Sequence, residues 1–543
     1  MIAPALRRHA GLLALLAVAA PLTVAFCWHG VISSLGDDSM SYIVVARWLV
    51  PFAHDDLSAP WVGYYSHFPP LFPLLLGVTG GAWNFFSAHM VVAACAVAAL
   101  ASIYAYGLRR LGGAGSALGL VVLFLALPTA WISIVGILSE PLYLAVSMAA
   151  LAFHARADVA RDTRASVIFA VLVAATLLTR VAGVALVAAC AVHVAVGSMK
   201  ARRWPSGREL LPLAVAVAVE LAWLAIRPHV ASKGYGLDVW TFMNRWIDHP
   251  LLLAGISANF LAGGWTSSID ADSGVPFAIQ AALWAVALLG LAGAVRGAMR
   301  NRLDSWYLLF GVGILFLWVF SEDNTRRLLY PLVPLMLVHA AEMAADAGER
   351  LGGARGKRWA LLVGAAFIVS LSAPATSLVA RKAFDREPLV EGLEYSPSSM
   401  TDYYIVVNLK AAKALAWRHA AVLSGLQLVD KVTPRDAVVM WLRPEYVAVL
   451  GRRRGEPSYS SWDRATLSRE ILRNGVTHVV SSRMFKSDLA DRGGDAYAAL
   501  MVDLPESLRH PALMIQNAET GSVELAVLEV DREALQREVG PKR

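Results

Sequence analysis

The sequence Gly36-Asp-Asp-Ser-Met-Ser-Tyr42, followed by His67-Phe-Pro-Pro-Leu-Phe-Pro73, decides how the rest of the chain is interpreted. Two adjacent carboxylates, Asp37 and Asp38, come directly after the first long apolar run. Carboxylates are costly to hold near the hydrocarbon of a membrane, so an acidic pair at that depth is a candidate functional site. A solvated loop that simply leaves the bilayer is the alternative for this pair taken alone.

The composition is that of a polytopic membrane protein. Of the 543 residues, 57% are hydrophobic and 16% are charged, whereas soluble domains average about 25% charge. Repeated apolar runs of roughly 17–25 residues are long enough to cross a bilayer as helices. The first run continues past Ala20 to Val31, so we interpret it as a retained first helix rather than a cleaved signal peptide. The three cysteines lie inside apolar runs and predict neither disulfides nor a thiolate metal site.

The apolar runs predict about eleven membrane spans. Their expected ranges are 11–33, 87–108, 117–135, 142–154, 167–178, 181–196, 210–226, a span ending near 295, a span ending at 320, 328–344 and 359–380. Connections rich in Lys and Arg alternate with connections that are not, and such excess marks the cytoplasmic side. We therefore expect a cytoplasmic N-terminus, an extracytoplasmic C-terminal region, and residence in a bacterial inner membrane.

This topology gathers polar residues from different spans on the non-cytoplasmic face. These residues are Asp37, Asp38, His67, Glu140, Arg180, Arg326 and Arg327. The connection Ser139-Glu-Pro141 is too short to carry its carboxylate far into water. Arg180 lies between apolar residues, so it is either paired or snorkels to the headgroups. Loop charges scattered at random would not produce this gathering.

Two regions outside the spans are expected to lie over or beside this face. The external loops 34–86 and 227–276 cover it, the first through an interfacial helix at 40–50 and the second as a surface-lying amphipathic segment. Residues 381–543 are more charged and long enough for one domain. The patterns at 436–441 and 475–481 predict strands, and a helix is expected at 464–472.

The expected fold class is therefore a polytopic α-helical membrane protein with two domains. Residues 1–380 form the transmembrane domain, and residues 381–543 form a small extracytoplasmic α/β domain. The chain contains no CxxC, HExxH, P-loop or dinucleotide motif, which disfavours ATP-driven and zinc chemistry.

A carboxylate near several cations at the membrane surface suits one class of reaction. The carboxylate can take a proton from an acceptor hydroxyl while that hydroxyl attacks a carbon atom. The cations can stabilise a phosphate as it leaves. The residues thus predict group transfer from a lipid-phosphate donor.

The same residues resemble the GT-C glycosyltransferases, especially the protein O-mannosyltransferase, aminoarabinose transferase and rhizobial lipopolysaccharide-core transferase families. The matching patches, in order, are the two quoted above, Leu138-Ser-Glu-Pro-Leu142, Leu178-Thr-Arg-Val-Ala-Gly183 and Arg327-Leu-Leu-Tyr-Pro-Leu-Val-Pro334. The resemblance covers about residues 10–345 and implies a GT-C-like fold. It also implies a polyprenyl-phosphate-linked sugar donor and a hydroxyl acceptor on a lipid, glycan or protein. Membrane lipid is a further expected partner, and no binding of nucleic acid is expected.

The resemblance also implies roles for single residues. Asp37 would be the catalytic base of an inverting displacement. Many members have Asp-Glu where this chain has Asp37-Asp38. The role of Asp38 is therefore open: it could be a second base, a hydrogen-bond anchor or a ligand for a divalent cation. A divalent cation is the one possible cofactor. Glu140 would shape the acceptor side. The expected substrate-binding residues are Tyr42, His67, Arg180, Arg326, Arg327 and Tyr330, with the three arginines as candidates for the lipid phosphate.

Two other classes of function remain as alternatives. A transporter or flippase of a lipid-linked or anionic substrate would also place ionisable residues inside a helical bundle. Transporters commonly show internal repeats and midplane sites, and neither is evident in this sequence. A membrane scaffold with an external binding domain would leave the gathered charges unexplained.

Overall fold

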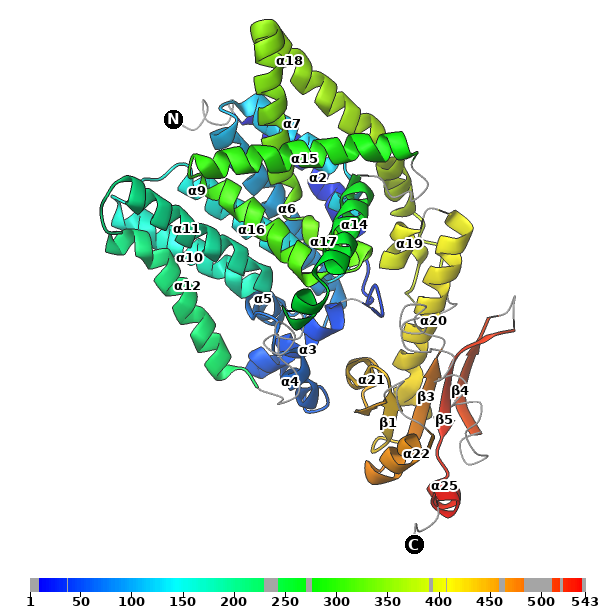
Figure 1. The fold of residues 1–543 in the computed structure, drawn as a ribbon. Helices are drawn as coiled ribbons and strands as arrows, with labels where there is room; N and C mark the ends of the chain where they lie inside the picture. Colours follow the sequence, from blue (N-terminus) through cyan, green and yellow to red (C-terminus); the bar gives the residue numbers. More distant parts are fainter. Residues whose placement is uncertain are drawn as a thin grey trace.

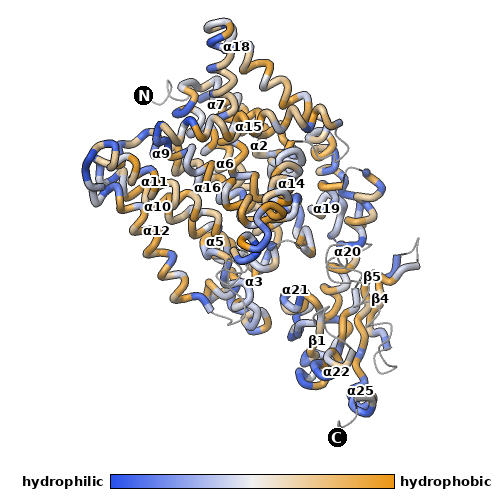
Figure 2. Tube along the Cα trace, viewed as in Figure 1, coloured by the Kyte–Doolittle hydropathy of each residue, from blue (hydrophilic) through white to orange (hydrophobic). Residues whose placement is uncertain are grey.

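The structure is a computed structural model and describes residues 9–36, 38–228, 243–269, 276–389, 394–406, 408–458, 464–482, 510–517 and 521–539. It is mostly helical, and the long helices form a bundle whose residues are largely apolar (Figures 1 and 2). The long helices are α2 (Ala10–Phe26), α6 (Phe85–Arg110), α7 (Ala114–Leu125), α9 (Glu140–His154), α10 (Thr163–Thr179), α11 (Val184–Lys200), α12 (Gly207–Ile226), α14 (Pro250–Ile269), α15 (Phe277–Met299), α16 (Leu303–Trp318) and α18 (Val333–Lys382).

Five helices of the described residues are long and apolar enough to cross a membrane. They are α6, the segment Val181–Lys200 that contains α11, α12, α15 and α18. Four shorter apolar helices, α2, α7, α10 and α16, accompany them. These helices agree with an integral membrane protein, and the total of about eleven spans stays a prediction.

Several predicted spans are corrected at their ends. The first ends at Phe26 rather than at residue 33. The third is interrupted, because α7 ends at Leu125 and the short helix α8 (Pro128–Ile132) begins at a proline, which cannot donate a backbone hydrogen bond inside a helix. The last two predicted spans are two arms of α18, which bends where Gly352 and Gly353 leave the helical conformation.

The two external loops also differ from expectation. Residues 40–50 do form a helix, α3 (Ser39–Leu49), but nine of its eleven residues are buried, so it is a core element rather than an interfacial one. The loop at 227–276 contains the 20-residue helix α14, which packs against α17 (Glu322–Leu329) and α16. The remaining short helices of the bundle are η1 (Pro51–Ala53), η2 (Ala59–Trp61), α4 (Val62–Tyr65), α5 (Leu71–Val78) and η3 (Val181–Gly183).

The segment after α18 contains a five-stranded sheet with the order β2-β1-β3-β5-β4. Its strands are β1 (Val438–Trp441), β2 (Arg454–Pro457), β3 (His478–Ser482), β4 (His510–Gln516) and β5 (Val523–Glu529), and its helices are η4 (Pro397–Ser399), α19 (Thr401–Ile405), α20 (Leu409–Val432), α21 (Pro444–Val449), α22 (Arg464–Arg473) and α25 (Arg532–Val539). β1 pairs in parallel with β2 and β3, while β5 pairs antiparallel with β3 and β4. The two expected strands and the expected helix are thus present as β1, β3 and α22.

This segment packs directly on the bundle. The amide of Thr401 donates a hydrogen bond to the carbonyl of Ser33 at 2.9 Å, and α21 contacts α3. Buried side chains from both regions belong to one continuous hydrophobic cluster, to which Tyr404 and Tyr446 contribute. The C-terminal segment and the loop that carries Asp38 are therefore neighbours (Figure 1).

Candidate active site

Glu140 is the first residue of α9 and is fully buried. Pro141 follows it in the first turn, where its missing amide proton is no loss to the helix. A carboxylate at this position also interacts favourably with the positive end of the helix dipole. The sequence thus places a negative charge inside the protein, which demands a cationic partner.

Arg180 is one of those partners. Its backbone is extended (φ −150°, ψ 145°) between the end of α10 and η3. Gly183 makes this sharp connection possible, because a Cβ at that position would lie 2.6 Å from the Cα of Leu177. Nη1 of Arg180 lies 2.7 Å from Oε2 of Glu140 and donates to Oγ of Ser139 at 3.2 Å. Of the two alternatives left by the sequence, Arg180 is therefore paired.

Arg327 is the second partner and joins the two carboxylates. It lies near the end of α17, and its Nε donates to Oε1 of Glu140 while its Nη2 donates to Oδ2 of Asp38. The residues Asp38, Glu140, Arg180 and Arg327 therefore form one ionic network, which we call the four-charge network. Its members come from four separate parts of the chain, and its two carboxylates are matched by its two guanidinium groups.

Asp38 has the most exposed side chain of the network, at 31%, whereas Arg180 and Arg327 are exposed by 12% and 20%. Burial by itself would raise the pKa of Asp38, but the positive charges of Arg327, Arg180 and Arg443 together hold that pKa below its usual value. Asp38 is therefore ionised at neutral pH. The backbone carbonyl of Asp38 also accepts a hydrogen bond from the amide of Tyr42 at 3.0 Å, which fixes Asp38 at the start of α3.

Aromatic residues extend the network toward the second quoted motif. The hydroxyls of Tyr42 and Ser139 are hydrogen-bonded at 2.7 Å. The ring of Tyr42 packs against Phe68 and Phe72, each with 5.0 Å between ring centroids, and His67 packs on Phe68. The structure thus links Tyr42 to the network through Ser139, to which Arg180 also donates, and His67 follows in the same aromatic cluster.

The remaining predicted residues lie differently. Tyr330 is buried after α17 and packs against Phe124 of α7, so it is part of the core. Arg326 is buried on α17, but the ion pairs of the described carboxylates Asp38 and Glu140 are made by its neighbour Arg327 and by Arg180. Asp37 lies outside the described residues.

Sequence reasoning missed the contribution of α21. Nη1 of Arg443 donates to the carbonyl of Leu35 at 3.2 Å, and the hydroxyl of Tyr446 donates to the carbonyl of Ser34 at 3.1 Å. Arg443 also forms an ion pair with the buried Glu445 at 2.5 Å. Burial would lower the pKa of Arg443, but Glu445, Tyr446 and Tyr65 together raise it above its usual value. The C-terminal segment therefore holds the chain just before the acidic pair.

We expect Arg443→Gln to loosen this attachment. The change leaves the carboxylate of Glu445, which is 1% exposed, without its cation, and breaking a buried pair in this way costs about 3–5 kcal/mol. Thermal unfolding of the purified protein should shift downward, and amide exchange should increase in the peptide around residues 33–42. Arg454→Gln is the matched control, because its pair with Glu456 is exposed and exposed pairs contribute about 0–1 kcal/mol. Equal effects of the two substitutions would contradict the assigned contact.

The structure provides no ready cation site among the residues that it describes, since these contain no group of three or more His, Cys, Asp or Glu side chains that could hold a metal ion. Asp38 pairs with Arg327 instead. The three roles left open for Asp38 stay predictions.

Comparisons with known proteins agree with this architecture. No protein-family model matches the chain, and no curated protein matches it significantly. Among solved structures, ArnT from Cupriavidus metallidurans bound to undecaprenyl phosphate is similar over 98% of this chain and 99% of that chain, with a TM-score of 0.51 and 18% identity. The oligosaccharyltransferase of Archaeoglobus fulgidus, tethered to an acceptor peptide, is similar over 99% of this chain and 75% of that chain, with a TM-score of 0.48 and 13% identity.

Both of these proteins are GT-C glycosyltransferases. At 18% identity, the likeness to ArnT shows that this chain has the GT-C membrane fold. The resemblance found in the sequence motifs is thereby confirmed at the level of the fold. The likeness to ArnT also extends over almost the whole chain, whereas the motifs covered only about residues 10–345.

Proposed function

We propose that this protein is a membrane glycosyltransferase that moves a sugar from a polyprenyl-phosphate-linked donor to a hydroxyl acceptor. The observation that carries the proposal is the four-charge network, in which Arg180 and Arg327 meet Asp38 and Glu140. A lipid-phosphate donor needs cations at the membrane surface, and its acceptor needs a base. The GT-C fold and the undecaprenyl phosphate bound to the structurally similar ArnT add support.

The proposed reaction is a single displacement. The acceptor hydroxyl oxygen attacks the anomeric carbon and Asp37 takes the hydroxyl proton. The bond between that carbon and the phosphate oxygen breaks, and the polyprenyl phosphate leaves with the bonding electrons. One displacement inverts the configuration at the anomeric carbon.

Arg180 and Arg327 would bind the departing phosphate. A guanidinium carries five N–H donors in a planar fork that suits phosphate oxygens. In its contacts with described side chains, Arg180 uses Nη1 to reach Ser139 and Glu140. Arg327 uses Nε for Glu140 and Nη2 for Asp38. Each therefore keeps N–H groups for a ligand while Asp38 and Glu140 hold the two side chains in place, and we assign these carboxylates the anchoring role.

The membrane arrangement is part of the proposal. Residues 1–380 would form the transmembrane domain, with about eleven spans and a cytoplasmic N-terminus. Residues 381–543 would form an extracytoplasmic α/β domain, so that transfer takes place at the outer face of a bacterial inner membrane. The basic ends of α6 and α11, at Arg110 and Lys200, lie on the face that this orientation assigns to the cytoplasm.

Donor binding gives a direct test. We expect Arg180→Met to weaken binding of undecaprenyl phosphate to the purified protein at least about tenfold, because a charge-assisted hydrogen bond to phosphate contributes about 1.5–3 kcal/mol. Microscale thermophoresis in detergent measures the affinity. Arg203→Met is the matched control, since Arg203 forms an exposed pair with Glu209 in the basic connection before α12. Unchanged affinity in a folded Arg180→Met protein would contradict the assignment of Arg180.

A further inference from the structure

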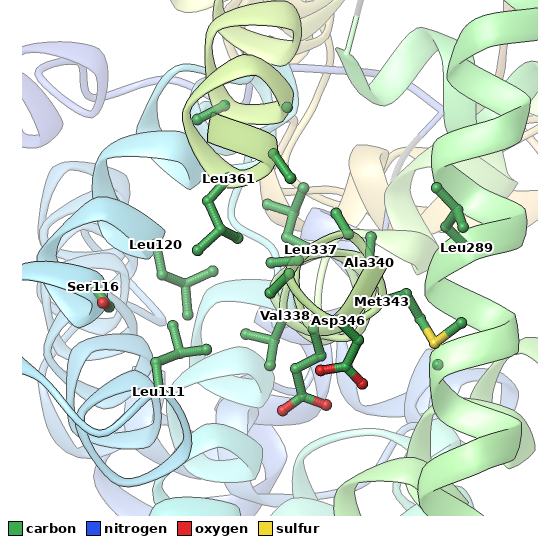
Figure 3. A pocket seen from close by; sticks show the side chains of 18 of the residues that line it. Leu111, Ser116, Leu120, Leu289, Leu337, Val338, Ala340, Met343, Asp346 and Leu361 are labelled. Atoms are coloured by element: carbon green, nitrogen blue, oxygen red, sulfur yellow. The ribbon is translucent and has the colours of Figure 1, made fainter. Parts of the chain in front are cut away.

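A cavity that none of the four-charge network residues lines lies among α6, α7, α15 and both arms of α18 (Figure 3). Its volume is about 750 Å³. Arg110, which lines it, is the last residue of α6. The cavity therefore belongs to the basic end of the bundle, where α18 bends.

The walls of the cavity are mostly apolar. In Figure 3, the first arm of α18, which carries Leu337, lies between Leu120 of α7 on one side and Leu289 of α15 on the other. Leu361 of the second arm also lines the cavity. Leu289 and Leu361 are exposed by 42% and 38%. In a bilayer, exposed apolar walls of this kind meet lipid chains rather than water.

The mouth of the cavity is basic. Five of the lining residues are cationic and two are acidic: Arg110, Arg296, Arg300, Arg302 and Lys357 against Glu342 and Asp346. Arg110 and Arg302 share Glu342 and Asp304, and Arg296 pairs with Asp346. Arg300 is exposed, and the 47% exposed side chain of Lys357 forms an ion pair with the exposed Glu349 at 3.2 Å. With Asp304 and Glu349 included, these five cations meet four described carboxylates, so an excess of one positive charge remains at the rim beside an apolar interior.

We propose that this cavity binds one anionic phospholipid of the leaflet on the basic side. An acyl chain lies between α7, α15 and the second arm of α18, and the phosphate-bearing headgroup meets Arg300 and Lys357. Basic pockets between transmembrane helices are known to bind anionic headgroups, and burial of an acyl chain adds affinity with each methylene group. The lipid bridges the two arms of α18 at the level of their bend.

Two glycines allow the cavity to be filled without disturbing its walls. A Cβ added at Gly119 of α7 or at Gly364 of α18 meets no other atom within 4 Å, and both glycines line the cavity. Leucine at either position would place its side chain where the acyl chain is proposed to lie. Gly313 of α16 has equally open surroundings without lining the cavity, so Gly313→Leu is the matched control.

Native mass spectrometry of the purified full-length protein, stripped of lipid in detergent, tests the proposal. Phosphatidylglycerol and phosphatidylcholine with identical acyl chains are the two probes. We expect the wild type and Gly313→Leu to bind phosphatidylglycerol at least about tenfold more tightly than phosphatidylcholine, a difference of about 1.4 kcal/mol. Gly119→Leu and Gly364→Leu should each lose phosphatidylglycerol binding, and Arg300→Gln combined with Lys357→Gln should bind the two lipids equally.

Either of two results would overturn the proposal. Equal affinity of the wild type for the two lipids would show that the rim does not select an anionic headgroup. Undiminished phosphatidylglycerol binding in folded Gly119→Leu or Gly364→Leu would show that the lipid binds elsewhere. The two cavity-filling variants change different helices, α7 and α18. Lipid binding is therefore judged on the variant whose thermal unfolding matches that of the wild type.

Discussion

Replacing Arg327 with Met should abolish sugar transfer and destabilise the protein by about 3–5 kcal/mol, the usual cost of leaving a buried charge without its partner. Arg327 is the only described residue that contacts both Asp38 and Glu140. Without it, Glu140 keeps Arg180 alone and Asp38 loses its guanidinium. Thermal unfolding in detergent measures the loss of stability, and transfer of labelled sugar measures the loss of activity.

A double variant separates the electrostatic effect from a loss of packing. If unpaired charge is the cause, Glu140→Gln should cost much less stability in the Arg327→Met protein than in the wild type, because the coupling between adjacent partners is about 0.5–3 kcal/mol. Arg203→Met, at an exposed pair, should change neither measurement. Additive effects of Arg327→Met and Glu140→Gln on stability would contradict the four-charge network.

The second large effect is expected for Asp37→Asn. Asn cannot take the proton from the acceptor hydroxyl, and loss of a general base should lower the rate of sugar transfer by about 10²–10⁴-fold. The substitution should leave thermal unfolding and undecaprenyl phosphate binding close to those of the wild type, because the proposed phosphate contacts come from Arg180 and Arg327. Single-turnover transfer with a saturating donor measures the chemical step.

Asp38→Asn is the matched control for Asp37→Asn. Asp38 is the described partner of Arg327, so its replacement should lower thermal stability, whereas Asp37→Asn should not. Because the pKa of Asp38 is held below its usual value, its stabilising contribution is present at neutral pH and is lost as the pH falls through that lowered pKa. A full rate in Asp37→Asn would contradict its role as the base.

Much of the bundle and part of the site were predictable from the sequence. Long apolar runs define spans wherever the helix is straight, as in α6 and α12, whose predicted ranges lie within the observed helices. Glu140 and Arg180 were identifiable because each interrupts an apolar region, where a charge needs a partner. The sequence left open whether Arg180 is paired or snorkels, since that depends on which helix ends meet.

The remainder depends on tertiary contacts. The pairing of Arg327 with Asp38 and Glu140 depends on the rotation of α17. Arg443 touches Leu35 across more than four hundred residues of chain, and no local pattern indicates such a contact. The run at 250–269 was assigned to a loop because its neighbours are rich in aromatic and charged residues, although its own 20 residues contain no charge and form α14. The break at Pro128 was readable as a helix start.

Transfer of a sugar from a lipid-phosphate donor can be measured directly. Purified protein in lipid vesicles should be offered a panel of radiolabelled polyprenyl-phosphate sugars together with membrane extract as the source of acceptor, with Asp37→Asn protein in parallel. We expect one donor to yield a labelled acceptor with wild-type protein and Asp37→Asn protein to yield at least about a hundredfold less. Movement of the intact labelled donor across the vesicle membrane by wild-type protein, with no sugar reaching an acceptor, would contradict the account and indicate a flippase.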